Sequence, residues 1–223
     1  VLELDEDELL EINALDLIIG SKTGNALSND DGTTDISLTD DISVQANVTN
    51  LLLLADGDID STAAANDVEV TNLALISGDE TTDGIGESFT FGTDVTTVTA
   101  DAGGSINILE NSTTTLNVGR VTINDFDGGA NNLDDTTATS TITIATTDGD
   151  LTTDNTGGSV ATSEASQVTL TAGGGDAFRA LTINNFVRSD GGEIELNATG
   201  NIVLNDADAD IQSHGDGGAQ GAT

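Results

Sequence analysis

The residues of this chain that could do chemistry are almost all carboxylates. Asp and Glu total 40 of 223 residues, against 4 Lys and Arg, 1 His and no Cys. The lack of cysteine excludes disulfides, thiolate metal sites and thiol nucleophiles, and a single His excludes a His-based metal cluster. The formal net charge of −36 repels phosphate, which excludes nucleic-acid binding and attachment to anionic lipid. What remains is carboxylate chemistry: cation binding or acid–base catalysis.

Two acidic runs resemble the start of a calcium-binding loop. They are residues 56–60 (DGDID) and 206–210 (DADAD), and the DGD of the first run returns at 148–150. Neither run has the glycine at position six or the glutamate at position twelve of an EF-hand. Two interpretations stay open: solvated turn residues, or ligands of Ca²⁺, the one cofactor that the sequence suggests. The second interpretation predicts these ligands: Asp56, Asp58, Asp60, Asp148, Asp150, Asp206, Asp208 and Asp210.

Paired carboxylates could also cleave a polysaccharide. Such an enzyme needs one carboxyl whose pKa is raised by burial, and a sugar site usually offers aromatic faces for stacking. The chain has five Phe and no Trp or Tyr, and its four cations are few for binding uronic acids. We therefore predict that the protein is not an enzyme and has no catalytic residues. A polysaccharide-cleaving enzyme ranks third among the functions considered.

Short stretches in which every second residue is aliphatic run through the chain. Alternation with period two is typical of a strand with one buried face. The inward residues are almost all Ile, Val and Leu, while Thr and Asp dominate the outward ones, so the core is narrow and aliphatic. The longest apolar run, 51–55, has the length of a buried strand and is too short to span a membrane. We predict an all-β chain, a single-stranded parallel β-solenoid (β-helix), with these residues in its core: Ile106, Ile108, Ile142, Ile144, Ile194 and Leu196.

Internal repetition suggests the length of one coil. The pattern at 104–108 returns 88 residues later at 192–196, and the DGD at 56–58 returns 92 residues later at 148–150. A unit of about 90 residues divides into four turns, which predicts about ten coils of roughly 22 residues. Stacked coils would bring equivalent Asp residues to about 4.8 Å, where they repel, so bound Ca²⁺ would stabilise the fold.

The predicted solenoid occupies residues 33–212. Residues 1–32 form an irregular acidic segment or a first coil, and a loop leaves the coil at 125–135. Residues 213–223 form a Gly-rich corner that leads into a further coil, so we expect the stack to continue past both ends, covalently or by assembly.

Two stretches resemble the degenerate repeats of very large bacterial surface proteins. One is 66–119, with DVEVTNLAL, SINI and TLNVG, and the other is 167–211, with VTLTAGG and GNIVLN. The chain resembles filamentous-haemagglutinin-like adhesins and other giant β-helical exoproteins over roughly residues 33–213. The resemblance implies a right-handed parallel β-helix, secretion, and a structural or adhesive role within a much longer polypeptide.

The expected function is that of a non-enzymatic structural module of an extracellular bacterial fibre or adhesin, located outside the cell or on its surface. It would act as a stiff rod or a filament-forming segment. Its partners would be other copies or neighbouring repeats, end to end, and cell-surface or matrix components. The alternative is a calcium-dependent carbohydrate- or matrix-binding module, which clustered aromatic residues on a concave face would favour.

Overall fold

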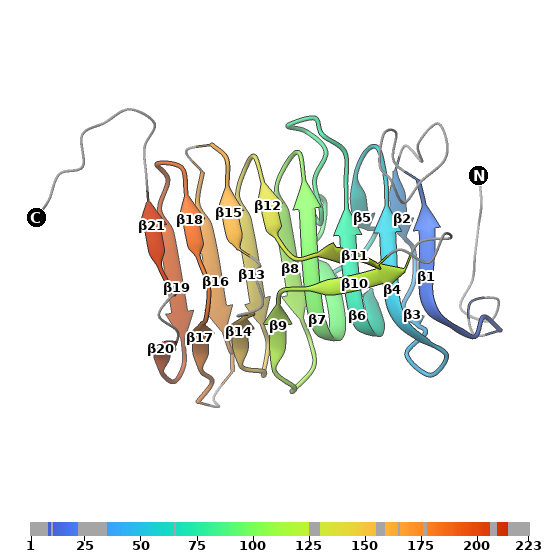
Figure 1. The fold of residues 1–223 in the computed structure, drawn as a ribbon. Helices are drawn as coiled ribbons and strands as arrows, with labels where there is room; N and C mark the ends of the chain where they lie inside the picture. The colour runs from blue at the N-terminus through green and yellow to red at the C-terminus, as the bar shows by residue number, and fades with distance from the viewer. Residues whose placement is uncertain are drawn as a thin grey trace, which may run out of the picture.

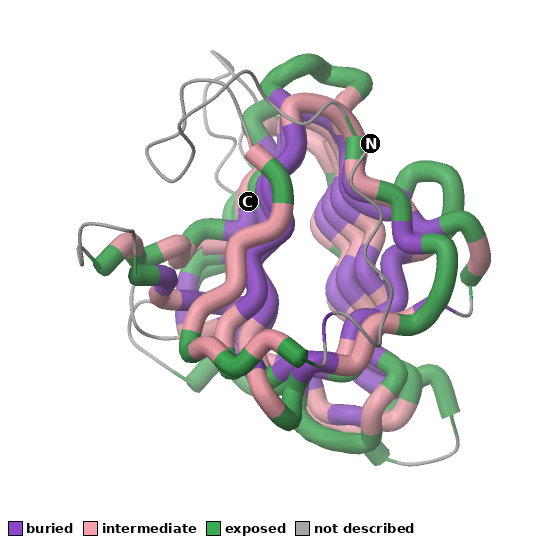
Figure 2. Tube along the Cα trace, turned by 90° about the vertical axis from the view of Figure 1, so that its right-hand side faces the viewer, coloured by how far each residue is buried: buried purple, intermediate pink, exposed green. Residues whose placement is uncertain are grey.

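The computed structural model describes residues 9, 11–21, 35–64, 66–124, 130–154, 159–164, 166–175, 178–205 and 209–213. Within these residues the fold is nearly all β, with 21 strands, and Leu9 is the one helical residue. Figure 1 shows the strands side by side, from β1 at the N-terminal end to β21 at the C-terminal end. Most belong to one large, mainly parallel sheet that curves around a common interior (Figure 2). The prediction of a β-rich, mainly parallel fold is confirmed.

In the C-terminal half, the strands form three parallel stacks, in which paired strands are three or five places apart along the chain. The first stack holds β12 (Thr136–Ala138), β15 (Val160–Thr162), β18 (Val187–Ser189) and β21 (Ile211–Ser213). The second holds β8 (Ile106–Glu110), β13 (Ile142–Thr146), β16 (Val168–Ala172) and β19 (Ile194–Ala198). The third holds β9 (Leu116–Val118), β14 (Leu151–Thr153), β17 (Leu181–Ile183) and β20 (Ile202–Leu204).

The N-terminal half uses longer strands that pair in sequence. They are β1 (Ala14–Gly20), β4 (Val48–Leu54), β6 (Asp67–Ile76) and β7 (Phe91–Ala102). Two short strands, β2 (Ile36–Leu38) and β3 (Ile42–Ser43), pair in parallel with β5 (Ile59–Ser61) and β6. Strand β7 then pairs with β8, β9 and β12, so it connects the N-terminal half to all three stacks. Strand β1 lies within residues 1–32, for which the sequence allowed either an irregular segment or a first coil.

The interior holds columns of aliphatic side chains that are paired in register. The longest column runs through Ile36, Ile59, Ile85, Ile106, Ile142, Val168 and Ile194. Branched aliphatic side chains pack well on a pleated surface. Each fully buried member contributes roughly 1.5–3 kcal/mol of transfer free energy. The columns are therefore the main stabilising feature of the fold.

The residues predicted to form the core lie in these columns. Four of them are fully buried: Ile106, Ile108, Ile142 and Ile144. Ile194 and Leu196 are partly buried and pack against the same cluster, because β19 is the last strand of its stack in the described residues.

The predicted coil length of roughly 22 residues is wrong as a general period. The step from Ile106 to its partner Ile142 takes 36 residues, and the steps to Val168 and then to Ile194 take 26 each. The 88-residue repeat therefore spans three steps and not four. The 92-residue repeat joins positions that are not equivalent, because Ile59 pairs with Ile36 and Ile85 whereas Leu151 pairs with Leu116 and Leu181. The number of residues between paired positions varies because residues inserted at a corner do not disturb the columns.

The long step contains an antiparallel hairpin, β10 (Val121–Asn124) and β11 (Ala130–Leu133), which begins four residues before the loop predicted at 125–135. Figure 1 shows both strands lying across the main strands. Val121 and Ile123 form a second, smaller core with residues on the outer side of the sheet: Leu52, Leu54, Ala74 and Ile76. This explains why residues 51–54 are all leucine, since β4 is buried on both of its faces.

Replacing Ile144 with Asp should lower the free energy of unfolding by about 3–5 kcal/mol, because it places an unpaired charge inside a column. Thr143 is the matched control, since it is the preceding residue of β13 and is only partly buried. Thr143→Asp should change stability by about 1 kcal/mol or less. Urea denaturation of both variants tests this, and equal midpoints for Ile144→Asp and the wild type would contradict the assignment of the core.

Candidate functional site

The predicted calcium ligands lie at separate corners of the fold. Asp56, Asp58 and Asp60 flank or occupy the start of β5, whereas Asp148 and Asp150 lie in the turn before β14. Asp210 directly precedes β21, and Asp206 and Asp208 lie outside the described residues. Among the described residues no group of three or more His, Cys, Asp or Glu side chains is arranged to hold a metal ion. Calcium binding by these residues stays a prediction.

Several aspartates that directly precede a strand accept a hydrogen bond from the backbone of the next step. Asp35 Oδ1 accepts from the N–H of Asp58 at 3.2 Å, and Asp58 Oδ1 accepts from the N–H of Gly84 at 2.9 Å. The same contact joins Asp150 Oδ1 to the N–H of Ala180 at 2.8 Å. Charge-assisted bonds of this kind are stronger than neutral ones. Two of the predicted metal ligands, Asp58 and Asp150, therefore have a structural role at the corners.

Two aspartates at these corners, Asp58 and Asp67, are partly buried and lie near other carboxylates. Burial raises the pKa of Asp58, and the carboxylates of Asp60, Asp35 and Asp83 raise it further, while the Gly84 N–H lowers it. Burial also raises the pKa of Asp67, against a hydrogen bond from Asn111 Nδ2 at 2.7 Å that lowers it. In both cases the folded chain favours the protonated form more than the unfolded chain does.

Glu110 is a buried carboxylate that the sequence interpretation missed. It ends β8 and is fully buried. Oε2 accepts from Thr93 Oγ1 at 2.9 Å and from the N–H of Val95 at 3.0 Å, and Oε1 accepts from the N–H of Ser112 at 3.0 Å. Burial raises its pKa despite these bonds. The signal was available, because Glu110 continues the inward alternation of Ile106 and Ile108.

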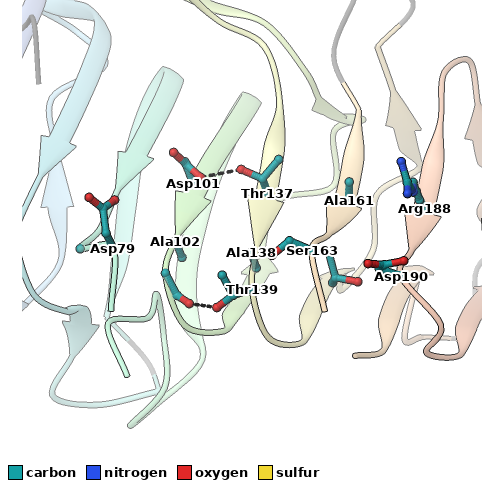
Figure 3. Close-up of a pocket in the computed structure, with 13 residues that line it drawn as sticks. Asp79, Asp101, Ala102, Thr137, Ala138, Thr139, Ala161, Ser163, Arg188 and Asp190 are labelled. Carbon is teal, nitrogen blue, oxygen red and sulfur yellow. Dashed lines mark hydrogen bonds between the residues drawn. The ribbon is translucent and has the colours of Figure 1, made fainter. Parts of the chain in front are cut away.

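A groove of about 510 Å³ crosses the outer surface of the first stack (Figure 3). Alanine side chains line it together with polar and charged side chains from the end of β7, from β12, β15 and β18, and from the neighbouring turns: Asp79, Asp101, Thr137, Thr139, Ser163, Arg188 and Asp190. Thr137 donates to Asp101, and Thr139 donates to the carbonyl of Gly103. These bonds tie β12 to the preceding step.

At the far end of the groove three polar side chains have no partner within the described residues. They are Ser163 on the turn after β15, Arg188 on β18 and Asp190 just after β18. Together they offer a guanidinium that donates hydrogen bonds, a carboxylate that accepts them, and a hydroxyl that can donate and accept. No aromatic residue lines the groove. Its chemistry suits a hydroxyl-rich or positively charged ligand better than an anion, because carboxylates outnumber cations there.

No family model, curated protein or solved structure matches this chain. Within the described residues no helix has the length and apolarity to cross a membrane. The resemblance to haemagglutinin-like exoproteins stays an expectation.

The corner hydrogen bonds can be tested at Asp58. Asp58→Asn keeps an oxygen acceptor and removes a repelled charge, so its free energy of unfolding should equal or exceed that of the wild type. Asp58→Ala should be about 1 kcal/mol less stable than Asp58→Asn, because the Gly84 N–H loses its partner. Asp148 is the matched control, since its carboxylate takes no hydrogen bond within the described residues and its Asn and Ala variants should be equally stable. Equal stability of the two Asp58 variants in thermal denaturation would contradict the structural role.

The buried carboxyl of Glu110 predicts that stability rises on mild acidification. Its pKa in the folded chain is raised above the usual 4.5, so the folded state binds the proton more tightly than the unfolded state. The cost of burying the charge is present above the raised pKa and is relieved as the pH falls from there towards 4.5. Asp58 and Asp67 act in the same direction. The melting temperature of the wild type should therefore increase as the pH is lowered from 7 into this range.

Glu110→Gln should make this pH dependence shallower, because it removes one titrating group. Glu195→Gln is the control, since Glu195 is an exposed residue of β19. Calorimetry across the pH range measures both slopes. A Glu110→Gln slope as steep as that of the wild type would contradict the prediction.

Proposed function

We propose that this chain is a parallel β-solenoid that acts as a non-enzymatic structural module, a stiff rod in an extracellular bacterial fibre or adhesin. The observation that carries the proposal is the in-register column from Ile36 to Ile194, in which each residue stacks on an aliphatic residue one step away. Six steps at about 4.8 Å give this column a length of roughly 29 Å. A continuous interior of this kind resists bending, which suits a rod that spans a distance.

The last step of the stack supports end-to-end association. Ile202 and Leu204 on β20 are 49% and 57% exposed, whereas their partners on β17, Leu181 and Ile183, are fully buried. Ile211 on β21 is 38% exposed, against full burial of its partner Val187. A further coil, from the same polypeptide or from a second copy, would bury these side chains and pair the open strand edges.

The extracellular location rests on the resemblance and on composition. Thr, Asn and Asp occupy outward positions on most of the strands. A chain without cysteine can cross an envelope without forming disulfides. The proposed partners are therefore neighbouring repeats or copies at the ends, and cell-surface or matrix components along the sides.

The groove over β12, β15 and β18 favours a second candidate function, a carbohydrate- or matrix-binding module that depends on calcium. Ser163, Arg188 and Asp190 present donors and acceptors of the kind that bind sugar hydroxyl groups. Binding would rest on hydrogen bonds alone, because no aromatic face lines the groove.

End-to-end association can be tested on β20. Ile202→Lys combined with Leu204→Lys puts charges on the exposed last step, so it should abolish association and leave thermal stability nearly unchanged. Val203→Lys is the matched control, because Val203 pairs with the outward residue Thr182 and does not continue the core. Light scattering over a range of concentrations, with electron microscopy, measures rod length. A wild-type chain that stays monomeric at high concentration, with its β19–β21 amides well protected, would contradict the proposal.

The calcium hypothesis predicts that millimolar Ca²⁺ raises the melting temperature more than Na⁺ of matched ionic strength. A bound divalent cation relieves specific carboxylate repulsion, whereas Na⁺ acts only by screening. The same samples, with Ca²⁺ or with a chelator, can be titrated with neutral and uronic oligosaccharides. Binding of the neutral sugar only with Ca²⁺, and its loss in Arg188→Gln, supports the second candidate. Equal effects of the two salts and no sugar binding would remove it.

A further inference from the structure

The hairpin β10–β11 is an insertion into an otherwise ordinary step. It leaves the stack after β9 and returns just before β12, and its two legs are joined at the base by an ion pair between Arg120 Nη2 and Asp134 Oδ2 at 3.0 Å. Removing residues 121–133 would shorten the step from Ile106 to Ile142 from 36 to 23 residues. That is the length of the step from Ile36 to Ile59. The stack therefore closes without the hairpin.

The hairpin packs on strands that are distant in sequence. Figure 1 shows it lying across β7, β6 and β4 towards β1. Val121 and Ile123 are buried against Leu52 and Leu54 of β4, in the second core that also contains Ile18 of β1. At the tip of β10, Asn124 Nδ2 donates to Asp16 Oδ2 of β1 at 2.7 Å, across 108 residues of sequence.

The covered surface is adapted to the hairpin. Outward positions on the C-terminal strands are mostly polar or small, such as Thr143, Thr152 and Ala161. On β4 and β6 the outward positions under the hairpin are Leu52, Leu54, Ala74 and Ile76, all buried. Without the hairpin these side chains would face water. The N-terminal strands and the hairpin thus form a matched pair of surfaces.

We infer that the hairpin is a strap that couples the opening of the N-terminal strands to the middle of the stack. In a stack where each step contacts only its neighbours, an end frays one step at a time. The strap adds a contact from the step of β9 and β12 to β1, β4 and β6. The strands β1 and β4 can therefore open only when the hairpin is released.

Hydrogen exchange of the full chain, read by mass spectrometry, tests the strap. Ile123→Asp puts a charge into the second core, and Thr122→Asp on the same strand is the control, because Thr122 is only partly buried. With the strap, Ile123→Asp should speed exchange in β1 and β4 by roughly tenfold or more. Exchange in β16 and β17, which lie outside the covered region, should not change, and Thr122→Asp should resemble the wild type.

A milder variant distinguishes local opening of the strands from unfolding of the whole chain. Asn124→Ala removes only the hydrogen bond to Asp16, so it should speed exchange in β1 more than in β4 and leave the other strands unchanged. Faster exchange confined to the hairpin itself in Ile123→Asp would overturn the inference, because the strands beneath would not depend on it. Equal acceleration in all strands in both variants would also overturn it, because the effect would then be global.

Discussion

Parallel pairing at about 4.8 Å places each side chain directly over its counterpart one step earlier, so every residue must suit the residue with which it is paired. Inside the fold the solution is aliphatic on aliphatic, as in the column from Ile36 to Ile194. On the outer face of β1, β4 and β6 the solution is a polar ladder: Asn72 Nδ2 donates to Asn50 Oδ1 at 2.7 Å, and Asn50 Nδ2 donates to Asp16 Oδ1 at 2.6 Å. Both solutions stack residues of similar chemistry, which restricts the residue types that the paired positions accept.

Acidic residues cannot follow that rule, because like charges at this spacing repel by roughly 0.9 kcal/mol even in water. The pairing largely avoids such contacts. Asp67 pairs with Gly92, Asp101 with Thr137, and Glu110 with Thr93 and Thr146. Among the paired strand residues in the described part, Glu69 with Asp94 is the one pair of two acids. Stacking brings equivalent aspartates together at the corner of Asp35 and Asp58, where the charge of Asp35 raises the pKa of Asp58, but it does not do so along most of the paired strand residues. Neutral residues separate the charges there, and at the corners backbone N–H groups accommodate them.

The period-two alternation was enough to predict a β-rich parallel fold and residues of its core. Side chains of a strand alternate between its two faces, so a strand with one buried face has an aliphatic residue at every second position. Coil length was not predictable, because inserting residues at a corner costs little loop entropy and leaves no periodic trace. The two DGD runs look like one repeat because both are turns that precede a strand, although they occupy different corners. The pair Val121-x-Ile123 shows the same alternation as the strands of the main sheet, so the sequence does not distinguish it from them. Its antiparallel partner and its position on the outer side of β4 could be recognised only from three-dimensional contacts.

The two ends of the stack differ in how well neighbouring residues cover the core. At the N-terminal end, Leu9 and Ile12 pack against the main core ahead of β1, and the hairpin holds β1 and β4 from outside. At the other end, Ile202 and Leu204 are exposed on β20, the last strand of its stack among the described residues. Because each step is stabilised by its neighbours, an added coil gains most where the last step is least covered. Within the described residues the stack is therefore covered at its β1 end and exposed at its β19–β21 end.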